Sequence, residues 1–291
     1  IKEDPKNQNL LYVGTEFGLF VSADRGANWT RWKGLPTVAV YDLVVHPRDN
    51  DLFLGTHGRS IIVMDDITPL QQLTPAVLSA ASHVFEIGPA VQYIPNENGW
   101  FLGGRSFRAP KRALGAFINY NLRAAAKDDV TIAISDASGN VVRRLKGPRT
   151  AGMHRVAWDL RAEPFGAATS GLAGAFVLTN LGPFVVPGDY RVQVTIDGKA
   201  ETRTAKVLPD PLVEITDADR QTLYKALVTL TDMQRTASSA ADSVVKLDEQ
   251  MTSIGTALKS HADVPPAVAT AVSNLSKRVT QLRTSIAGRP G

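Results

Sequence analysis

The side chains that could carry out catalysis are scattered along the 291-residue chain. There is no cysteine, which excludes disulfides, thiolate zinc sites and cysteine nucleophiles. No histidine stands at metal-ligand spacing from another histidine or from a carboxylate. We therefore expect structural or surface roles for the histidines, and neither a metal site nor a cofactor. The five histidines are His46, His57, His83, His154 and His261.

Asp65 and Asp66 are an acidic pair that could be read as a glycosidase site. A retaining glycosidase needs two carboxylates about 5 Å apart on one substrate. Adjacent residues of a strand point to opposite faces, so this pair is not expected to act together. The chain also lacks G-x-S-x-G, a phosphate-binding glycine loop and H-E-x-x-H. We predict no catalytic residues here and leave open the activity of any longer parent protein.

The most specific spacing in the chain is S-x-D-x-G-x-x-W, formed by Ser22, Asp24, Gly26 and Trp29. Serine and aspartate side chains in a turn accept hydrogen bonds from nearby backbone amides, and glycine tolerates a positive φ. The tryptophan can then fold back and bury its ring against the hairpin. The chemistry of this motif is therefore that of a turn, and we predict a structural role for all four residues.

The motif lies inside a sequence repeat. Residues 5–15 are echoed by residues 47–56, and the matching glycines, Gly14 and Gly55, are 41 residues apart. Both copies continue into a glycine-containing turn and a second apolar strand. A period of about 40 to 45 residues with several short strands per unit is typical of β-propeller blades.

Two features of residues 1–67 resemble a known family. The S-x-D-x-G-x-x-W spacing matches the Asp-box of bacterial neuraminidase repeats at its four defining positions. The second copy ends in a Gly-Thr-His-Gly-Arg hairpin, an apolar strand and Asp-Asp-Ile, which resembles the closing blade of bacterial sortilin-type or glycosyl-hydrolase-like repeat proteins. The hairpin residues are Gly55, Thr56, His57, Gly58 and Arg59. The resemblance implies that a β-sandwich like the Ig-like domain of flagellar hook-capping proteins follows, and then helices.

Residues 68–82 are predicted to be a linker with a short helix, and residues 83–211 an Ig-like β-sandwich. Period-2 alternation over 116–122 and 130–135 indicates half-buried strands. Further strands are predicted at 81–86, 90–93, 141–145, 154–160, 188–196 and 201–208, with turns between them. Pro187-Gly188-Asp189-Tyr190 matches a recurrent feature of hook-capping-type domains.

Residues 212–291 are predicted to form an antiparallel helical hairpin. Thr216 is placed to cap a helix over 217–259, and apolar residues then recur at heptad spacing. After Pro265-Pro266 a second helix is predicted over 267–287. The first helix would be about 65 Å long and the second about 32 Å.

Because of this mismatch, the N-terminal half of the first helix has no partner within the hairpin. Its apolar residues are Leu223, Leu227, Leu230 and Met233. We expect them to lie on the sandwich, on the propeller or on a second copy of the chain, so that the helices are candidates for an oligomer contact.

The net charge of +4 is unevenly distributed. Residues 100–161 hold twelve Lys and Arg against four Asp. Such a bias can attract anionic partners, but Phe117 and Tyr120 follow strand patterns and do not interleave with the basic residues as a base-stacking platform would. We therefore expect solvated faces and no nucleic-acid partner. No run of 18 apolar residues predicts a membrane span.

Fewer than two full blades cannot close a propeller, so the remaining blades are expected upstream in a longer protein or on another chain. The start at Ile1, without Met or a signal peptide, is interpreted as a cut through that protein. The predicted role is a non-enzymatic binding or scaffold fragment of a secreted, periplasmic or cell-surface protein, in contact with protein or glycan. The alternative is an accessory C-terminal region of a glycoside hydrolase whose active site lies in absent upstream blades. Assembly-factor work on membrane complexes is a third hypothesis.

Overall fold

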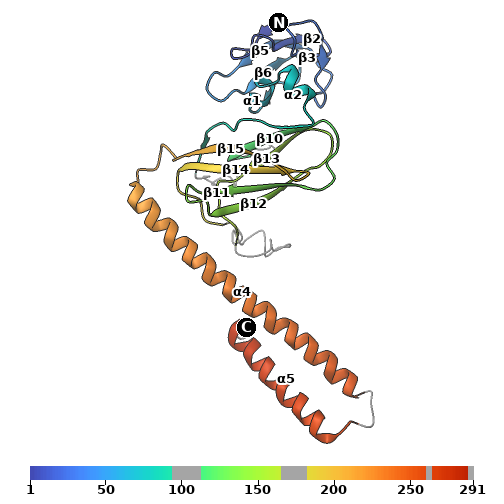
Figure 1. Cartoon of the computed structure of the whole chain (residues 1–291), viewed down its shortest axis with the longest axis vertical. Helices are drawn as coiled ribbons and strands as arrows, with labels where there is room; N and C mark the ends of the chain where they lie inside the picture. The colour runs from blue at the N-terminus through green and yellow to red at the C-terminus, as the bar shows by residue number, and fades with distance from the viewer. Residues whose placement is uncertain (94–112, 165–181, 260–263, 288–291) are drawn as a thin grey trace. The chain divides into compact units, whose positions relative to one another are not determined.

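The computed structural model describes residues 1–93, 113–164, 182–259 and 264–287. It is built mainly of β-strands with two long helices at the C-terminal end, as predicted (Figure 1). The chain divides into two compact units. The first unit comprises residues 1–161 and 184–214, and the second comprises residues 162–183 and 215–291.

The N-terminal part of the first unit contains two antiparallel sheets. The first sheet has the order β1-β2-β3-β4 and the second β5-β6-β7. Their strands are β1 (Lys2–Glu3), β2 (Leu11–Thr15), β3 (Gly18–Ser22), β4 (Thr30–Arg31), β5 (Val40–Val45), β6 (Leu52–Thr56) and β7 (Ile61–Met64). The sequence repeat therefore corresponds to two equivalent hairpins, β2–β3 and β6–β7.

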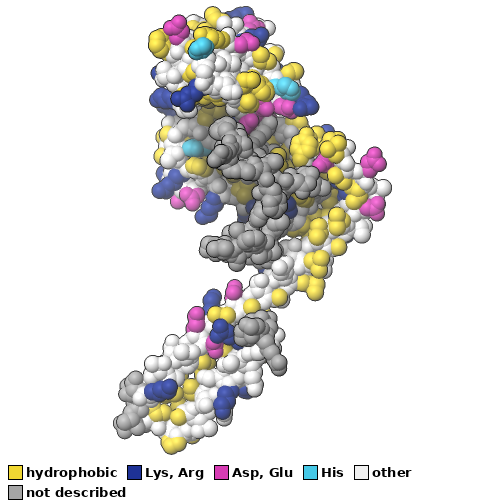
Figure 2. All heavy atoms as spheres, turned by 180° about the vertical axis from the view of Figure 1, so that it is seen from behind, with side chains coloured by type: hydrophobic (Ala, Val, Ile, Leu, Met, Phe, Trp, Pro, Cys, Tyr) yellow, Lys and Arg dark blue, Asp and Glu magenta, His cyan; other side chains and the backbone are white. Residues whose placement is uncertain are grey.

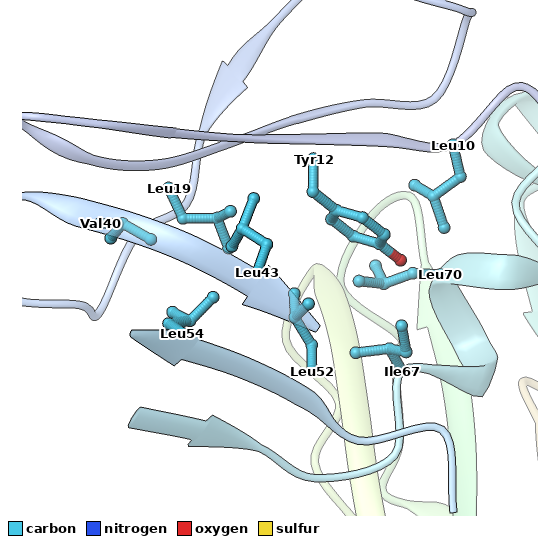
Figure 3. Close-up of a cluster of buried hydrophobic side chains, with 9 residues drawn as sticks. All are labelled: Leu10, Tyr12, Leu19, Val40, Leu43, Leu52, Leu54, Ile67 and Leu70. Carbon is cyan, nitrogen blue, oxygen red and sulfur yellow. The ribbon is translucent and has the colours of Figure 1, made fainter. Parts of the chain in front are cut away.

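The two sheets share one apolar core. Alternation along each strand sends every second side chain into the space between the sheets. Figure 3 shows these side chains pointing toward one another from both sheets and from the segment after β7. The core residues are Leu10, Tyr12, Leu19, Val40, Leu43, Leu52, Leu54, Ile67 and Leu70.

Gly14 allows the two backbones to approach closely. A Cβ atom at this position would lie 2.5 Å from the carbonyl oxygen of Val40 on β5. Real Cβ atoms do not approach a backbone oxygen so closely, so any larger residue would push the sheets apart. The glycine at the end of β2 is thus a packing requirement between the sheets.

A connector joins these sheets to the rest of the first unit. It contains two short helices, α1 (Thr68–Gln71) and α2 (Pro75–Ser79), where the sequence predicted one. Thr74 caps α2, because its Oγ1 accepts a hydrogen bond from the amide of Val77 at 3.2 Å.

The remaining strands form two facing sheets, with orders β13-β10-β8 and β12-β11-β14-β15-β9. Trp158 is fully buried, and its ring lies in an edge-to-face arrangement with the ring of Tyr190 on the opposite sheet, at 5.2 Å between centroids. The strands predicted at 116–122, 130–135 and 188–196 are confirmed. The strands are β8 (Ser82–Val84), β9 (Ala90–Val91), β10 (Ala116–Leu122), β11 (Val130–Ser135), β12 (Val141–Gly147), β13 (Gly152–Trp158), β14 (Gly188–Ile196) and β15 (Lys199–Leu208).

The second unit contains α4 (Asp217–Lys259) and α5 (Pro266–Ala287). Thr216 caps α4 as predicted, since its Oγ1 accepts a hydrogen bond from the amide of Asp219 at 3.2 Å. The shorter helix lies antiparallel to the C-terminal half of the longer one, where Arg283 and Asp248 form an ion pair at 2.6 Å (Figure 1). Among the described helices, none has a segment long and apolar enough to cross a membrane.

Candidate binding surface

The predicted Asp-box residues form a self-contained turn. Ser22 is buried, and its Oγ accepts a hydrogen bond from the amide of Gly26 at 2.8 Å and donates one to Asp24 Oδ1 at 2.7 Å. Asp24 in turn accepts from the amide and side chain of Asn28, at 2.8 and 2.6 Å. The turn itself thus engages both side chains.

Trp29 folds back over this turn, as predicted. A Cβ on Gly26 would lie 3.7 Å from the Trp29 ring and 3.5 Å from Leu11. The prediction that the ring is buried was only partly right, because Trp29 is 37% exposed. Gly26 has a φ of 90°, in the left-handed region that favours glycine.

Replacing Ser22 with alanine should lower the free energy of unfolding by about 1 to 2 kcal/mol, because the Gly26 amide and Asp24 each lose a partner. Urea denaturation of the first unit measures this change. Ser79→Ala is the matched control in the same unit, since the Ser79 hydroxyl donates to the Ala76 carbonyl of its own short helix. A Ser22→Ala variant as stable as that control would contradict the account of the turn.

Acid should weaken the same turn. The hydrogen bonds from Asn28 hold the pKa of Asp24 below its usual value, followed in effect by the bond from Ser22. A carboxylate whose pKa is lowered by folding stabilises the fold above its ordinary pKa of about 4 and loses that contribution as the pH falls through the lowered value. The stability difference between wild type and Asp24→Asn should therefore shrink below about pH 4. A difference that is constant from pH 7 to pH 3 would rule out this role.

The predicted hairpin of Gly55, Thr56, His57, Gly58 and Arg59 is also a closed backbone turn. The amide and hydroxyl of Thr56 both donate to the Ser60 carbonyl, at 3.1 and 2.6 Å. The His57 amide donates to the carbonyl of Ala39 at 2.9 Å, and the imidazole lies 5.4 Å from the ring of Tyr41. These contacts hold the loop that follows β6 against the start of β5.

The side of the second sheet away from the shared core is apolar and exposed. Val44, Phe53 and Val63 are direct neighbours across β5, β6 and β7, and Ile61 lies opposite Gly55 in the next row. Val44 is 48%, Val63 43% and Ile61 65% exposed. We call this surface the open face. Its residues are Asp42, Val44, Phe53, Gly55, Ile61 and Val63.

Gly55 lies in a shallow, open depression of about 370 Å³ on this face. The depression is lined by Asp42, Val44, His46, Phe53, Gly55 and Ile61. A Cβ on Gly55 would meet only Asp42 of its own sheet, at an ordinary distance of 3.6 Å. Its lining is mostly apolar, with the Asp42 carboxylate and the His46 imidazole as the polar groups.

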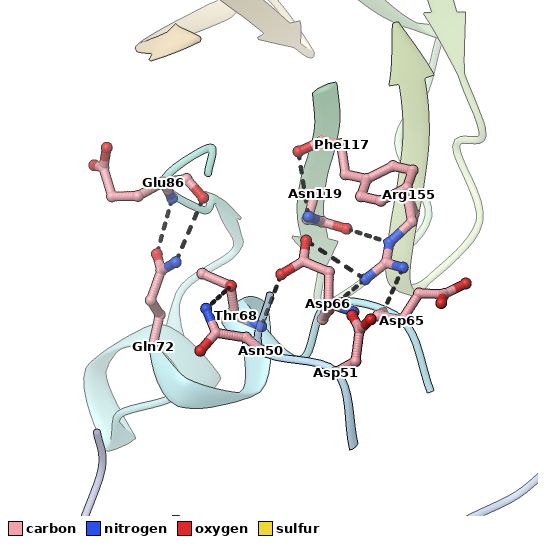
Figure 4. Close-up of polar contacts among 10 residues, drawn as sticks. All are labelled: Asn50, Asp51, Asp65, Asp66, Thr68, Gln72, Glu86, Phe117, Asn119 and Arg155. Carbon is pink, nitrogen blue, oxygen red and sulfur yellow. Dashed lines mark hydrogen bonds and ion pairs between the residues drawn. The ribbon is translucent and has the colours of Figure 1, made fainter. Parts of the chain in front are cut away.

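Arg155 on β13 makes the principal polar contact between the N-terminal sheets and the rest of the first unit (Figure 4). Its guanidinium donates to the carbonyls of Asp65 and Asp66 at 2.8 and 2.6 Å, and to Oδ1 of the buried Asn119 at 3.0 Å. The same group stacks over the Phe117 ring at 4.8 Å. Sequence analysis missed this site. The one signal in the sequence was Asn119, a polar residue that is buried within a mostly apolar strand.

The interpretation of Asp65 and Asp66 as adjacent strand residues was wrong. β7 ends at Met64, so the pair follows the strand, and Asp66 has a φ of 48°. The Asp66 amide donates to Asp51 Oδ1 at 2.8 Å, and both backbone carbonyls of the pair are engaged by Arg155. These residues shape the exit from the second sheet.

The predicted helix interface is exposed. Figure 2 shows hydrophobic side chains along the N-terminal half of α4. Val244 and Met251, further along the same heptad stripe, are buried in the half of α4 beside α5. The exposed residues are Leu223, Leu227, Leu230 and Met233.

In the described part of the chain, no three His, Asp or Glu side chains gather in a way that could hold a metal ion. His261 lies outside the described residues. Part of the basic stretch 100–161 also lies outside the described residues. Within the rest, Lys146 Nζ lies 3.6 Å from Asp129 Oδ2, and Arg143 Nη2 lies 3.9 Å from Asp159 Oδ2.

Comparisons with known proteins leave the family unassigned. No protein-family model matches the chain, and no curated protein matches its sequence. The resemblance to Asp-box repeat proteins therefore rests on the spacing of the turn residues and on the internal repeat.

Proposed function

We propose that this chain is a non-enzymatic binding and scaffold module whose N-terminal sheets are blades of an Asp-box propeller. The observation that carries the proposal is the open face. Cross-strand neighbours Val44, Phe53 and Val63 form a continuous apolar row on a sheet that is already packed on its other side. Large exposed apolar patches mark protein contacts, so the partner surface is proposed to be a protein.

The proposal also agrees with the hydrogen bonding of the polar side chains, which serves to hold the fold together. The side chains of Ser22 and Asp24 close their own turn, and Arg155 joins the N-terminal sheets to the two facing sheets. A rigid support with an exposed apolar face is the property expected of a scaffold. From the resemblance we further propose a secreted, periplasmic or cell-surface location and an Ig-like class for the two facing sheets.

Hydrolysis assays on a panel of aryl glycosides, with an aryl sialoside included, test the non-enzymatic role. We expect no turnover above buffer, and no saturable binding of the same glycans by calorimetry. Saturable turnover that scales with protein concentration and is reduced in Asp65→Asn or Asp66→Asn would overturn the proposal. It would favour a role within a glycoside hydrolase instead.

A further inference from the structure

The open face has an internal counterpart that is already covered. The pairs Tyr12–Val21 and Gly14–Leu19 face each other across β2 and β3. Their equivalents 41 and 42 residues later are Phe53–Val63 and Gly55–Ile61, in the same register across β6 and β7. The first set is covered by the second sheet, whereas the second set forms the open face. The chain therefore shows what covers this kind of face, which is another sheet of the same repeat.

The covering surface also has a counterpart, on the first sheet. In the second sheet, Leu54 and Ile62 are cross-strand neighbours on the side turned to the first sheet. The equivalent pair in the first sheet is Val13 and Phe20, on the side away from the shared core and partly exposed. We call this side the outer face, made of Leu11, Val13 and Phe20. All three residues are apolar, as are their equivalents Leu52, Leu54 and Ile62.

We propose that the outer face of one copy of this chain docks on the open face of a second copy, in the way the second sheet docks on the first within each copy. This inference rests on the proposed function and names the partner. The open and outer faces are different surfaces, so the contact is head-to-tail and can continue from copy to copy. Each copy of residues 1–291 contributes its two N-terminal sheets to such a contact, and propellers close with about four to eight blades. A closed ring of about two to four copies is therefore expected.

Light scattering after size exclusion of the full chain tests the assembly. The expected result is one discrete species of about two to four copies. Val44→Lys with Ile61→Lys blocks the open face, and Phe20→Lys blocks the outer face. Each variant should elute as a single chain, because one of the two required faces is lost. Leu230→Lys disrupts the alternative contact predicted on α4, at a leucine that is 59% exposed, and should leave the assembly unchanged.

Mixing the two blocked variants gives the sharpest result. One retains an intact outer face and the other an intact open face, so the mixture should form a dimer with one copy of each and nothing larger. Circular dichroism checks that Phe20→Lys is folded, and if it is not, Val13→Lys blocks the outer face in its place. A monomeric wild type, an assembly dissolved by Leu230→Lys, or a mixture that stays monomeric would overturn the inference. The glycoside assays do not depend on the oligomeric state, so a failure of this inference can be told apart from a failure of the proposed function.

Discussion

Replacing Arg155 with alanine is expected to lower the free energy of unfolding of the first unit by about 3 kcal/mol, because charge-assisted hydrogen bonds contribute more than neutral ones. The variant loses the bonds to the Asp65 and Asp66 carbonyls and leaves the buried Asn119 without this donor. Urea denaturation measures the loss. Hydrogen exchange should also show faster exchange of the β6 and β7 amides, because the contact at the exit of the second sheet is broken.

Two further variants define what Arg155 contributes. Arg155→Lys keeps the charge but not the planar group that reaches two carbonyls at once, so an intermediate loss is expected. Arg59→Ala removes an arginine from the tip of the Gly55–Arg59 hairpin and should change stability little. If Arg155→Ala were as stable as Arg59→Ala, the contact would have no role in joining the sheets.

Gly14→Ala is expected to destabilise the first unit by about 2 to 3 kcal/mol, because overpacking forces backbone shifts. The new methyl group would lie 2.5 Å from the Val40 carbonyl oxygen, which belongs to backbone and cannot rotate away. Gly55→Ala is the matched control at the equivalent position of the repeat. Its methyl group would meet Asp42 at 3.6 Å, so the isolated chain should keep its stability.

Thermal denaturation at low protein concentration compares the two alanine variants without any effect from self-association. Equal melting temperatures for the two variants would show that the close approach of the sheets at Gly14 is not required. That result would remove the structural equivalence on which the docking of a further sheet is argued.

The strands and helices followed from local signals in the sequence. The strands at 116–122 and 130–135 are bounded by turn residues, so their limits depend on nearby residues alone. Residues 130–135 alternate between buried and more exposed positions as predicted, whereas the prediction that 116–122 is half-buried was wrong, because six of its seven residues are buried. The long helix was predicted over 217–259 because Thr216 caps it and the heptad stripe runs to its end. The turn from Ser22 to Trp29 is equally local, since Ser22 and Asp24 bond groups within four residues.

The contacts of Arg155 could not be predicted in this way. They join residues about 90 positions apart, and two of the three acceptors are backbone carbonyls, which leave no trace in side-chain identity. The conformation of Asp66 depends on the same long-range contact and on Asp51, so its strand-like neighbourhood was misleading. The repeat did predict two equivalent hairpins, but only the structure shows which side of each is covered.

The central claim is that the open face is a protein-docking surface, and hydroxyl-radical footprinting of the assembled wild-type chain tests it most directly. Phe53 and Ile61 should be modified several-fold more slowly in wild type at high concentration than in the monomeric Phe20→Lys variant, whose open face is intact. Phe17, exposed in the turn between β2 and β3 and outside both faces, should react equally in the two samples. Equal reactivity of Phe53 and Ile61 in both samples would contradict the account.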